Sequence, residues 1–166
     1  VTESAFVVNG SIYDCKGGFN YQNVNMKSGV RNIKVFNAPQ AGVFDRCFYM
    51  DFEEIFHSGG TSIAAPSFSF PSAANAITFK KVITTSVWCY HFVDATAISM
   101  IGCTQEGGDL AIKISGVMIG LSIEGNYAEA VKTWLDMSNA SQVQMSVKSN
   151  YFNYIDKVLT SAGATP

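Results

Sequence analysis

The stretch Leu121-Ser122-Ile123-Glu124-Gly125-Asn126-Tyr127 decides the fold, because a closely similar stretch follows it in the chain as Met145-Ser146-Val147-Lys148-Ser149-Asn150-Tyr151. Each copy begins with an apolar-Ser-apolar triplet, whose first and third side chains point to the same side of a β-strand. The pattern also stands one repeat earlier at Ile98-Ser99-Met100, and related triplets lie at Ile77-Thr78-Phe79 and Ile33-Lys34-Val35. A repeat of about 23 residues predicts a solenoid in which each coil packs on the next.

The repeat predicts an all-β fold, a right-handed parallel β-helix of about seven coils. The first residue of each triplet should face inward, so that stacking buries one column made of Ile33, Ile77, Ile98, Leu121 and Met145. The coil between the first two of these should contribute Met50-Asp51-Phe52. We expect parallel strands near residues 33–37, 77–82, 97–102, 119–124 and 143–148. A leucine-rich repeat has a similar period, but its Leu-x-x-Leu-x-Leu frame is absent from the sequence.

A second register indicates that each coil carries at least two strands. Equal steps along the chain separate four side chains that should face the interior: Cys89, Ile112, Leu135 and Val158. Alternation along the strands then places their neighbours on the outer surface, namely Trp88, Tyr90, Lys113, Trp134 and Asp136.

Charge and composition narrow the function. Only 14% of the residues are charged and the net charge is −2, so we expect no nucleic-acid partner. No apolar run reaches the ~20 residues that cross a bilayer, and no signal peptide is visible, so no membrane insertion is expected. We interpret residues 1–166 as a single domain and a segment of a longer protein, because the chain opens in the middle of the pattern without an initiator Met.

The four cysteines, Cys15, Cys47, Cys89 and Cys103, lack the paired spacing of zinc ligands. No metal site is therefore expected, and the cysteines are interpreted as buried free thiols in a protein that folds in a reducing cytosol. The motifs that bind phosphates or dinucleotides are also missing, so we expect no cofactor.

A strand that runs into Asn-Tyr in two successive coils, at Asn126-Tyr127 and Asn150-Tyr151, resembles the pectate-lyase-like β-helix, especially the forms found in bacteriophage tailspikes and tail fibres. The phrase Gly29-Val30-Arg31-Asn32-Ile33-Lys34-Val35 is similar to coil openings of that superfamily. The earlier coils depart from the pattern, since no Asn-Tyr follows Phe79 or Met100. In structural terms, an Asn amide at a bend can hydrogen-bond to the coils above and below it.

The resemblance implies a receptor-binding segment that engages a bacterial surface polysaccharide. It also implies a homotrimer with its coils side by side, located in the virion tail and acting outside the cell after folding in the host cytoplasm. Many proteins of this kind cleave the polysaccharide, so an active depolymerase, either a glycoside hydrolase or a lyase, is the second hypothesis. A purely structural β-helical spacer is the third.

The predicted outer surface offers a candidate ligand site. Sugar rings lie on flat aromatic faces beside hydrogen-bonding groups, and Trp88 and Trp134 should flank a gap at Ala111. Tyr90, Lys113 and Asp136 should complete this ligand-binding surface. The same exposed tryptophans could instead pack against a neighbouring subunit, and the sequence leaves both interpretations open.

The densest acidic cluster supplies the catalytic candidates, Asp51 and Glu53. If Met50 and Phe52 face inward, these two carboxylates face outward together, and their repulsion would raise one pKa as a general acid requires. His57 should lie within reach of them. The alternative is an irregular coil with a solvated acidic rim.

Overall fold

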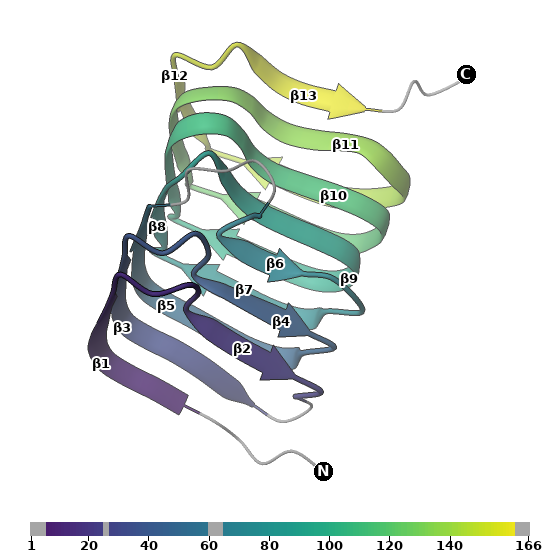
Figure 1. Cartoon of the computed structure of the whole chain (residues 1–166). Coiled ribbons are helices and arrows are strands. Elements are labelled where there is room, and N and C mark those ends of the chain that lie inside the picture. The colour runs from purple at the N-terminus through teal and green to yellow at the C-terminus, as the bar shows by residue number, and fades with distance from the viewer. Residues whose placement is uncertain (1–5, 25–26, 60–64, 162–166) are drawn as a thin grey trace.

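The computed structural model describes residues 6–24, 27–59 and 65–161. These residues form one continuous sheet of 13 strands, wound into a parallel β-helix of about six turns (Figure 1). Every strand pair is parallel, and the described residues contain no helix. The all-β parallel β-helix predicted from the repeat is therefore confirmed.

The strands follow one another around the solenoid, and the longest of them continue around a corner. Their bounds are β1 Phe6–Tyr13, β2 Phe19–Gln22, β3 Ser28–Phe36, β4 Gly42–Asp45, β5 Phe48–Ser58, β6 Phe68–Phe70, β7 Asn75–Lys80, β8 Ile83–Thr85, β9 Trp88–Ile101, β10 Thr104–Glu124, β11 Tyr127–Lys148, β12 Tyr151–Asn153 and β13 Lys157–Ser161.

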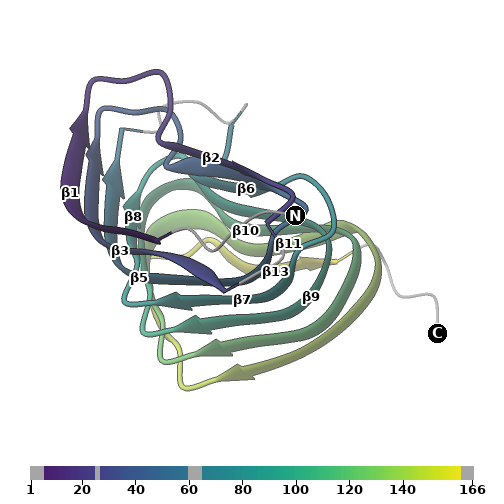
Figure 2. The ribbon, with the colours of Figure 1, turned by 90° about the horizontal axis from the view of Figure 1, so that it is seen from below.

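The strand pairings divide the wall into three faces. Face 1 stacks residues 6–8, 28–31, 50–53, 77–80, 98–101, 121–124 and 145–148. Face 2 stacks residues 10–12, 33–35, 55–58, 83–85, 104–106, 127–129 and 151–153. Face 3 stacks residues 19–22, 42–45, 68–70, 90–93, 112–115, 135–137 and 159–161. Seen along the solenoid, β5 and β7 of face 1 lie across the interior from β2 and β6 of face 3 (Figure 2).

The buried column of face 1 largely follows the predicted triplets. Met50 pairs with Ile77 and Ile77 with Ile98, as expected, and all three are buried. Two members differ from the prediction. Ile33 pairs with Ile55 on face 2, because the coil from Met50 to Ile77 is longer than the even repeat assumed from the sequence. Met145 is 38% exposed, since no described coil covers it.

Aromatic rings fill the space between the faces. Tyr21, Phe44, Phe70 and Phe92 stack from coil to coil on face 3, with ring centroids 5.7, 5.1 and 5.2 Å apart. Phe44 also meets Phe52 of face 1 edge-on at 4.8 Å. These contacts bury large apolar areas and join opposite faces, so the interior is a packed core.

The corner between faces 1 and 2 has the same backbone conformation in every coil. Seven residues at this position have positive φ: Asn9, Asn32, Glu54, Lys81, Gly102, Gly125 and Ser149. Next to this column, the predicted asparagine ladder is confirmed. Asn150 Oδ1 accepts from the backbone N–H of Asn126, and Asn126 Oδ1 accepts from that of Cys103, both at 2.9 Å.

Candidate functional site

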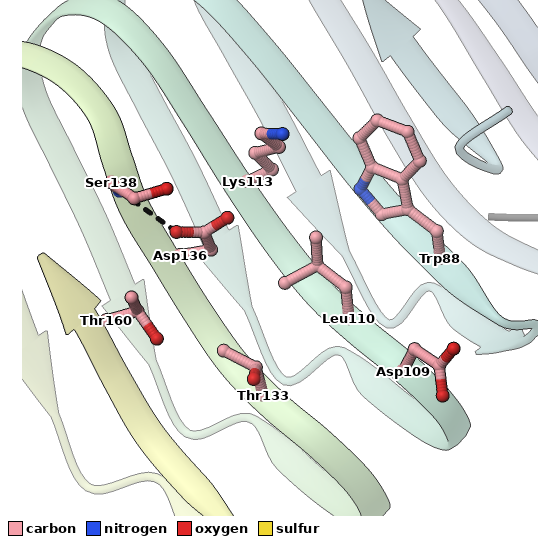
Figure 3. A pocket seen from close by; sticks show the side chains of 8 residues that line it. All are labelled: Trp88, Asp109, Leu110, Lys113, Thr133, Asp136, Ser138 and Thr160. Atoms are coloured by element: carbon pink, nitrogen blue, oxygen red, sulfur yellow. Dashed lines mark hydrogen bonds between the residues drawn. The ribbon is translucent and has the colours of Figure 1, made fainter. Parts of the chain in front are cut away.

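A groove on the outer surface of face 3 has a volume of about 410 Å³. Its wall is formed by side chains from β9, β10, β11 and β13: Trp88, Asp109, Leu110, Lys113, Thr133, Asp136, Ser138 and Thr160. Figure 3 shows these side chains projecting from neighbouring strands, with Trp88 at one end and Thr160 at the other. The groove therefore runs along the solenoid across successive coils.

Trp88 provides the aromatic face of the groove. Its indole N–H donates to the carbonyl oxygen of Tyr90 at 3.1 Å, which fixes the ring against its own strand. The imidazole of His91 lies beside it with ring centroids 5.1 Å apart, and the Lys113 ammonium lies 5.7 Å from the ring centroid. The indole is thus held in one orientation while remaining partly exposed.

Polar groups line the rest of the groove. Lys113 pairs in register with Asp136 of the next coil, yet neither side chain has an ion-pair partner among the described residues. Asp136 Oδ1 accepts from the backbone N–H of Ser138 at 2.9 Å, which orients the carboxylate. At the rim, the Asp109 carboxylate already forms an ion pair with Lys132 at 2.6 Å. Lys113 and Asp136 are therefore open to a ligand.

His91 lies at the edge of the groove and shares a 3.1 Å hydrogen bond with Ser115. Partial burial lowers the pKa of His91 below its usual value, and the nearby Lys113 ammonium lowers it further. The imidazole is therefore neutral at neutral pH and leaves Lys113 as the cation on this side of the groove.

Three of the five predicted ligand-binding residues lie together in this groove, namely Trp88, Lys113 and Asp136. The other two were assigned to the wrong side of the wall. Tyr90 is fully buried and stacks on Phe68 with ring centroids 5.3 Å apart. Trp134 is 2% exposed and packs edge-on against Phe152 at 4.7 Å. Neither ring can stack on a sugar.

The error comes from the coil spacing on face 3. Trp88 pairs with Leu110, and Leu110 with Thr133, so the first of these two steps is one residue shorter than the second. Trp134 is therefore one position beyond the Trp88 column. Trp134 occupies the position in its coil that Ala111 occupies in the preceding coil. Ala111 is also buried, and its small side chain leaves interior room for the indole. Likewise Ile112 pairs with Tyr90 rather than with Cys89, and Leu135 pairs with Leu159 rather than with Val158.

Five groove residues were missed by sequence reasoning: Asp109, Leu110, Thr133, Ser138 and Thr160. Two of them, Leu110 and Thr133, could have been found from the position of Trp88. A step along the chain one residue shorter than the repeat leads from Trp88 to Leu110. A full step then leads from Leu110 to Thr133. The strictly constant step that sequence reasoning used skips both.

The acidic coil on face 1 differs from a tuned acid–base pair. Met50 and Phe52 are buried, so Asp51 and Glu53 do share the outer side as predicted. Glu53, however, contacts Arg31 at 2.7 Å and Lys80 at 3.2 Å. The hydrogen bond from Lys80, aided by the charge of Arg31, lowers the pKa of Glu53, so Glu53 is not the carboxyl with the raised pKa that a general acid requires.

His57 does not approach the carboxylates. It lies on face 2, is fully buried, and contacts the Ala38 carbonyl through Nε2 and the Ser67 hydroxyl through Nδ1, both at 2.9 Å. The predicted proximity of His57 to Asp51 and Glu53 is therefore wrong, because the chain turns the corner at Glu54 between them.

Three of the four cysteines are poor candidates for a nucleophile. Cys47, Cys89 and Cys103 are buried free thiols, as predicted, and burial raises the pKa of each to about 11. Cys15 is also a free thiol, but it is only partly buried, which differs from the prediction.

Within residues 6–24, 27–59 and 65–161, no three His, Cys, Asp or Glu side chains cluster as metal ligands would. The same residues contain no helix long and apolar enough to cross a membrane. No protein-family model, curated protein or solved structure matches the chain.

Proposed function

We propose that this β-helix binds a saccharide chain in the face 3 groove, as the receptor-binding segment of a bacteriophage tailspike or tail fibre. The single observation that carries the proposal is the groove itself. It combines a fixed, partly exposed indole with an ammonium and a carboxylate that have no ion-pair partner among the described residues.

The groove chemistry suits a pyranose chain. A sugar ring can lay its C–H face on Trp88 while its hydroxyls donate to Asp136 and accept from Lys113. Thr133 and Thr160 add hydroxyls farther along the groove. Neighbouring coils lie ~4.8 Å apart, so a groove that crosses several coils has room for more than one sugar ring along the solenoid.

The geometry favours binding over cleavage. Glycoside hydrolysis uses two carboxyl groups about 5–9 Å apart, one of them with a raised pKa. In the groove, Asp109 is occupied by Lys132, which leaves Asp136 without a second open carboxylate. On face 1, Glu53 has a lowered pKa. Neither the groove nor the face 1 cluster of Asp51 and Glu53 therefore supplies the depolymerase hypothesis with a carboxylate pair of this kind.

The phage context and the homotrimer come from the sequence resemblance and remain proposals. Light scattering of the full-length protein tests the trimer, and a stable monomer would contradict it. The virion location is tested by immunogold labelling of phage tails with an antibody against this segment.

A polysaccharide array tests the function. The wild-type chain should bind at least one bacterial surface polysaccharide, and Trp88→Ala should weaken that binding about tenfold. Tyr13→Ala is the matched control, because Tyr13 is 61% exposed on β1 and lies outside the groove. Binding that is unchanged in Trp88→Ala would contradict the groove as the site. Release of reducing ends from the bound polysaccharide would favour the depolymerase instead.

A further inference from the structure

A second depression lies on the outer side of face 1, at the N-terminal coils. Two cavities of about 250 and 350 Å³ share Lys27 and Asp51 in their walls. The smaller one extends to Tyr49 and Ala76, and the larger one extends to Phe6 and Glu53. We call the two together the Asp51 trough. It has an exposed aromatic ring at each end, since Tyr49 is 57% and Phe6 58% exposed.

Gly29 lines the larger cavity and has no side chain to fill it. Gly29 pairs with Asp51, at the outward position that later coils fill with Thr78, Ser99 and Ser122. A Cβ atom at Gly29 would lie 2.8 Å from the Asp51 carbonyl oxygen and 3.4 Å from the Phe6 ring. Any larger residue would therefore crowd the floor of the trough.

Tyr49 occupies a corner where a large side chain is unfavourable. Its φ is 58°, and the equivalent corners of the next coils carry Ala76, Ala97 and Gly120, also with positive φ. A bulky side chain is destabilising in the left-handed region. Its ring is nevertheless mostly exposed, so packing in the core does not offset this cost. The Tyr49 ring therefore borders the trough without being packed into the core.

Asp51 and Glu53 differ in how fully their charges are already paired. Glu53 is clamped between Arg31 and Lys80 at 2.7 and 3.2 Å. Asp51 lies 4.0 Å from the Lys27 ammonium, which is longer than a direct hydrogen bond. A hydroxyl placed between them can accept from Lys27 and donate to Asp51. Because Glu53 has two close ion-pair partners, we regard it as structural. The Asp51 carboxylate has no partner within direct hydrogen-bond distance among the described residues and is open to a ligand.

We propose that the Asp51 trough is a second saccharide-binding site, in which a sugar ring stacks on Tyr49 and its hydroxyls bridge Lys27 and Asp51. The ligand class is a neutral, hydroxyl-rich sugar, because the open pair carries one charge of each sign. This assigns Asp51 a role in binding.

The trough and the face 3 groove are separate sites. Faces 1 and 3 meet inside the solenoid, where Phe52 contacts Phe44, so their outer surfaces point away from each other. The groove also lies on β9 to β13, whereas the trough lies on β1 to β7 with the residues that precede β3. This inference therefore goes beyond the proposed function, and each site can fail without the other.

The test uses the full chain on the same array of bacterial surface polysaccharides. Tyr49→Ala and Asp51→Asn should each weaken binding of at least one polysaccharide about tenfold, and Tyr49→Phe should retain it. Tyr154→Ala is the matched control for Tyr49, because Tyr154 also has positive φ and is 80% exposed, outside both sites. Glu124→Gln, an exposed carboxylate on face 1, is the control for Asp51.

The outcomes separate the two sites. Loss in the Tyr49 and Asp51 variants with binding kept in Trp88→Ala supports the trough and contradicts the groove. Loss only in Trp88→Ala overturns the trough and leaves the groove intact. The trough is also overturned if no polysaccharide binds to the wild-type chain, or if Tyr154→Ala weakens binding as much as Tyr49→Ala. Circular dichroism of each variant confirms that the coils remain folded.

Discussion

The ammonium of Lys113 lies 5.7 Å from the centroid of the Trp88 ring, which belongs to the preceding coil. A cation at this distance is attracted to the ring by about 0.5–1 kcal/mol at an exposed site. The contact places a positive charge beside the indole, and the same charge lowers the pKa of His91. The pKa of His91 can therefore be used to detect the Lys113 ammonium in the groove.

Lys113→Met should raise the pKa of His91, because it removes the repulsion between the ammonium and the imidazolium while the larger effect of burial remains. An NMR titration of the His91 ring protons measures the change. Lys132→Met is the control, since Lys132 is paired with Asp109 at the rim of the groove. An unchanged pKa in Lys113→Met would place the ammonium away from the imidazole.

The two tryptophans should differ sharply in stability. Trp134→Ala should lower the free energy of unfolding by about 3–5 kcal/mol, because it leaves a cavity beside Phe152. Trp88→Ala should cost less, because its ring is partly exposed and borders the groove. Urea denaturation followed by circular dichroism measures both. Equal losses would show that Trp88 is a packing residue.

Gly108 should tolerate no side chain. Its φ is 114°, and a Cβ atom there would lie 2.4 Å from the Ser86 carbonyl oxygen of the preceding coil. Gly108→Ala should therefore lower the melting temperature far more than Gly107→Ala, whose position also has positive φ but open space around it. Calorimetry distinguishes them. Similar melting temperatures would mean that the coils can separate at this corner without cost.

Acid should destabilise the coils around His57. Burial lowers the pKa of His57 in the folded state, although its hydrogen bond to Ala38 opposes the shift. The unfolded chain therefore binds a proton more readily, and the stability contributed by His57 is complete above about pH 6.5 and falls as pH drops toward the folded-state pKa. The free energy of unfolding at pH 7.5 and pH 5 should differ less in His57→Gln than in the wild-type chain. An equal difference would assign the acid sensitivity to other groups.

The sequence predicts the later coils of face 1 and their corner well because both repeat with little change from Ile77 onward. Ile77, Ile98 and Leu121 occupy equivalent positions in successive coils, and the Asn126 and Asn150 amides bond across coils as their spacing suggests. Physical necessity explains this regularity, since a buried strand that slips by one residue exposes its whole apolar side.

Face 3 was harder to predict around the groove because the step from Trp88 to Leu110 is one residue shorter than the step from Leu110 to Thr133. The pairs Cys89-Tyr90, Ala111-Ile112 and Trp134-Leu135 are buried at both positions. Simple alternation assigns one member of each pair to the surface, and this assumption misplaced Tyr90 and Trp134. The charge environment of Glu53 was also not visible locally, since Arg31 and Lys80 come from the coils on either side.

The stacking of parallel coils also determines how the molecule responds to force. Hydrogen bonds between neighbouring coils run along the solenoid, so a pull on one end acts first on the outermost coil, and the strands peel away one turn at a time. A sideways push is shared by three faces that aromatic contacts such as Phe44–Phe52 join across the interior. We therefore expect unfolding under force to begin at the end coils.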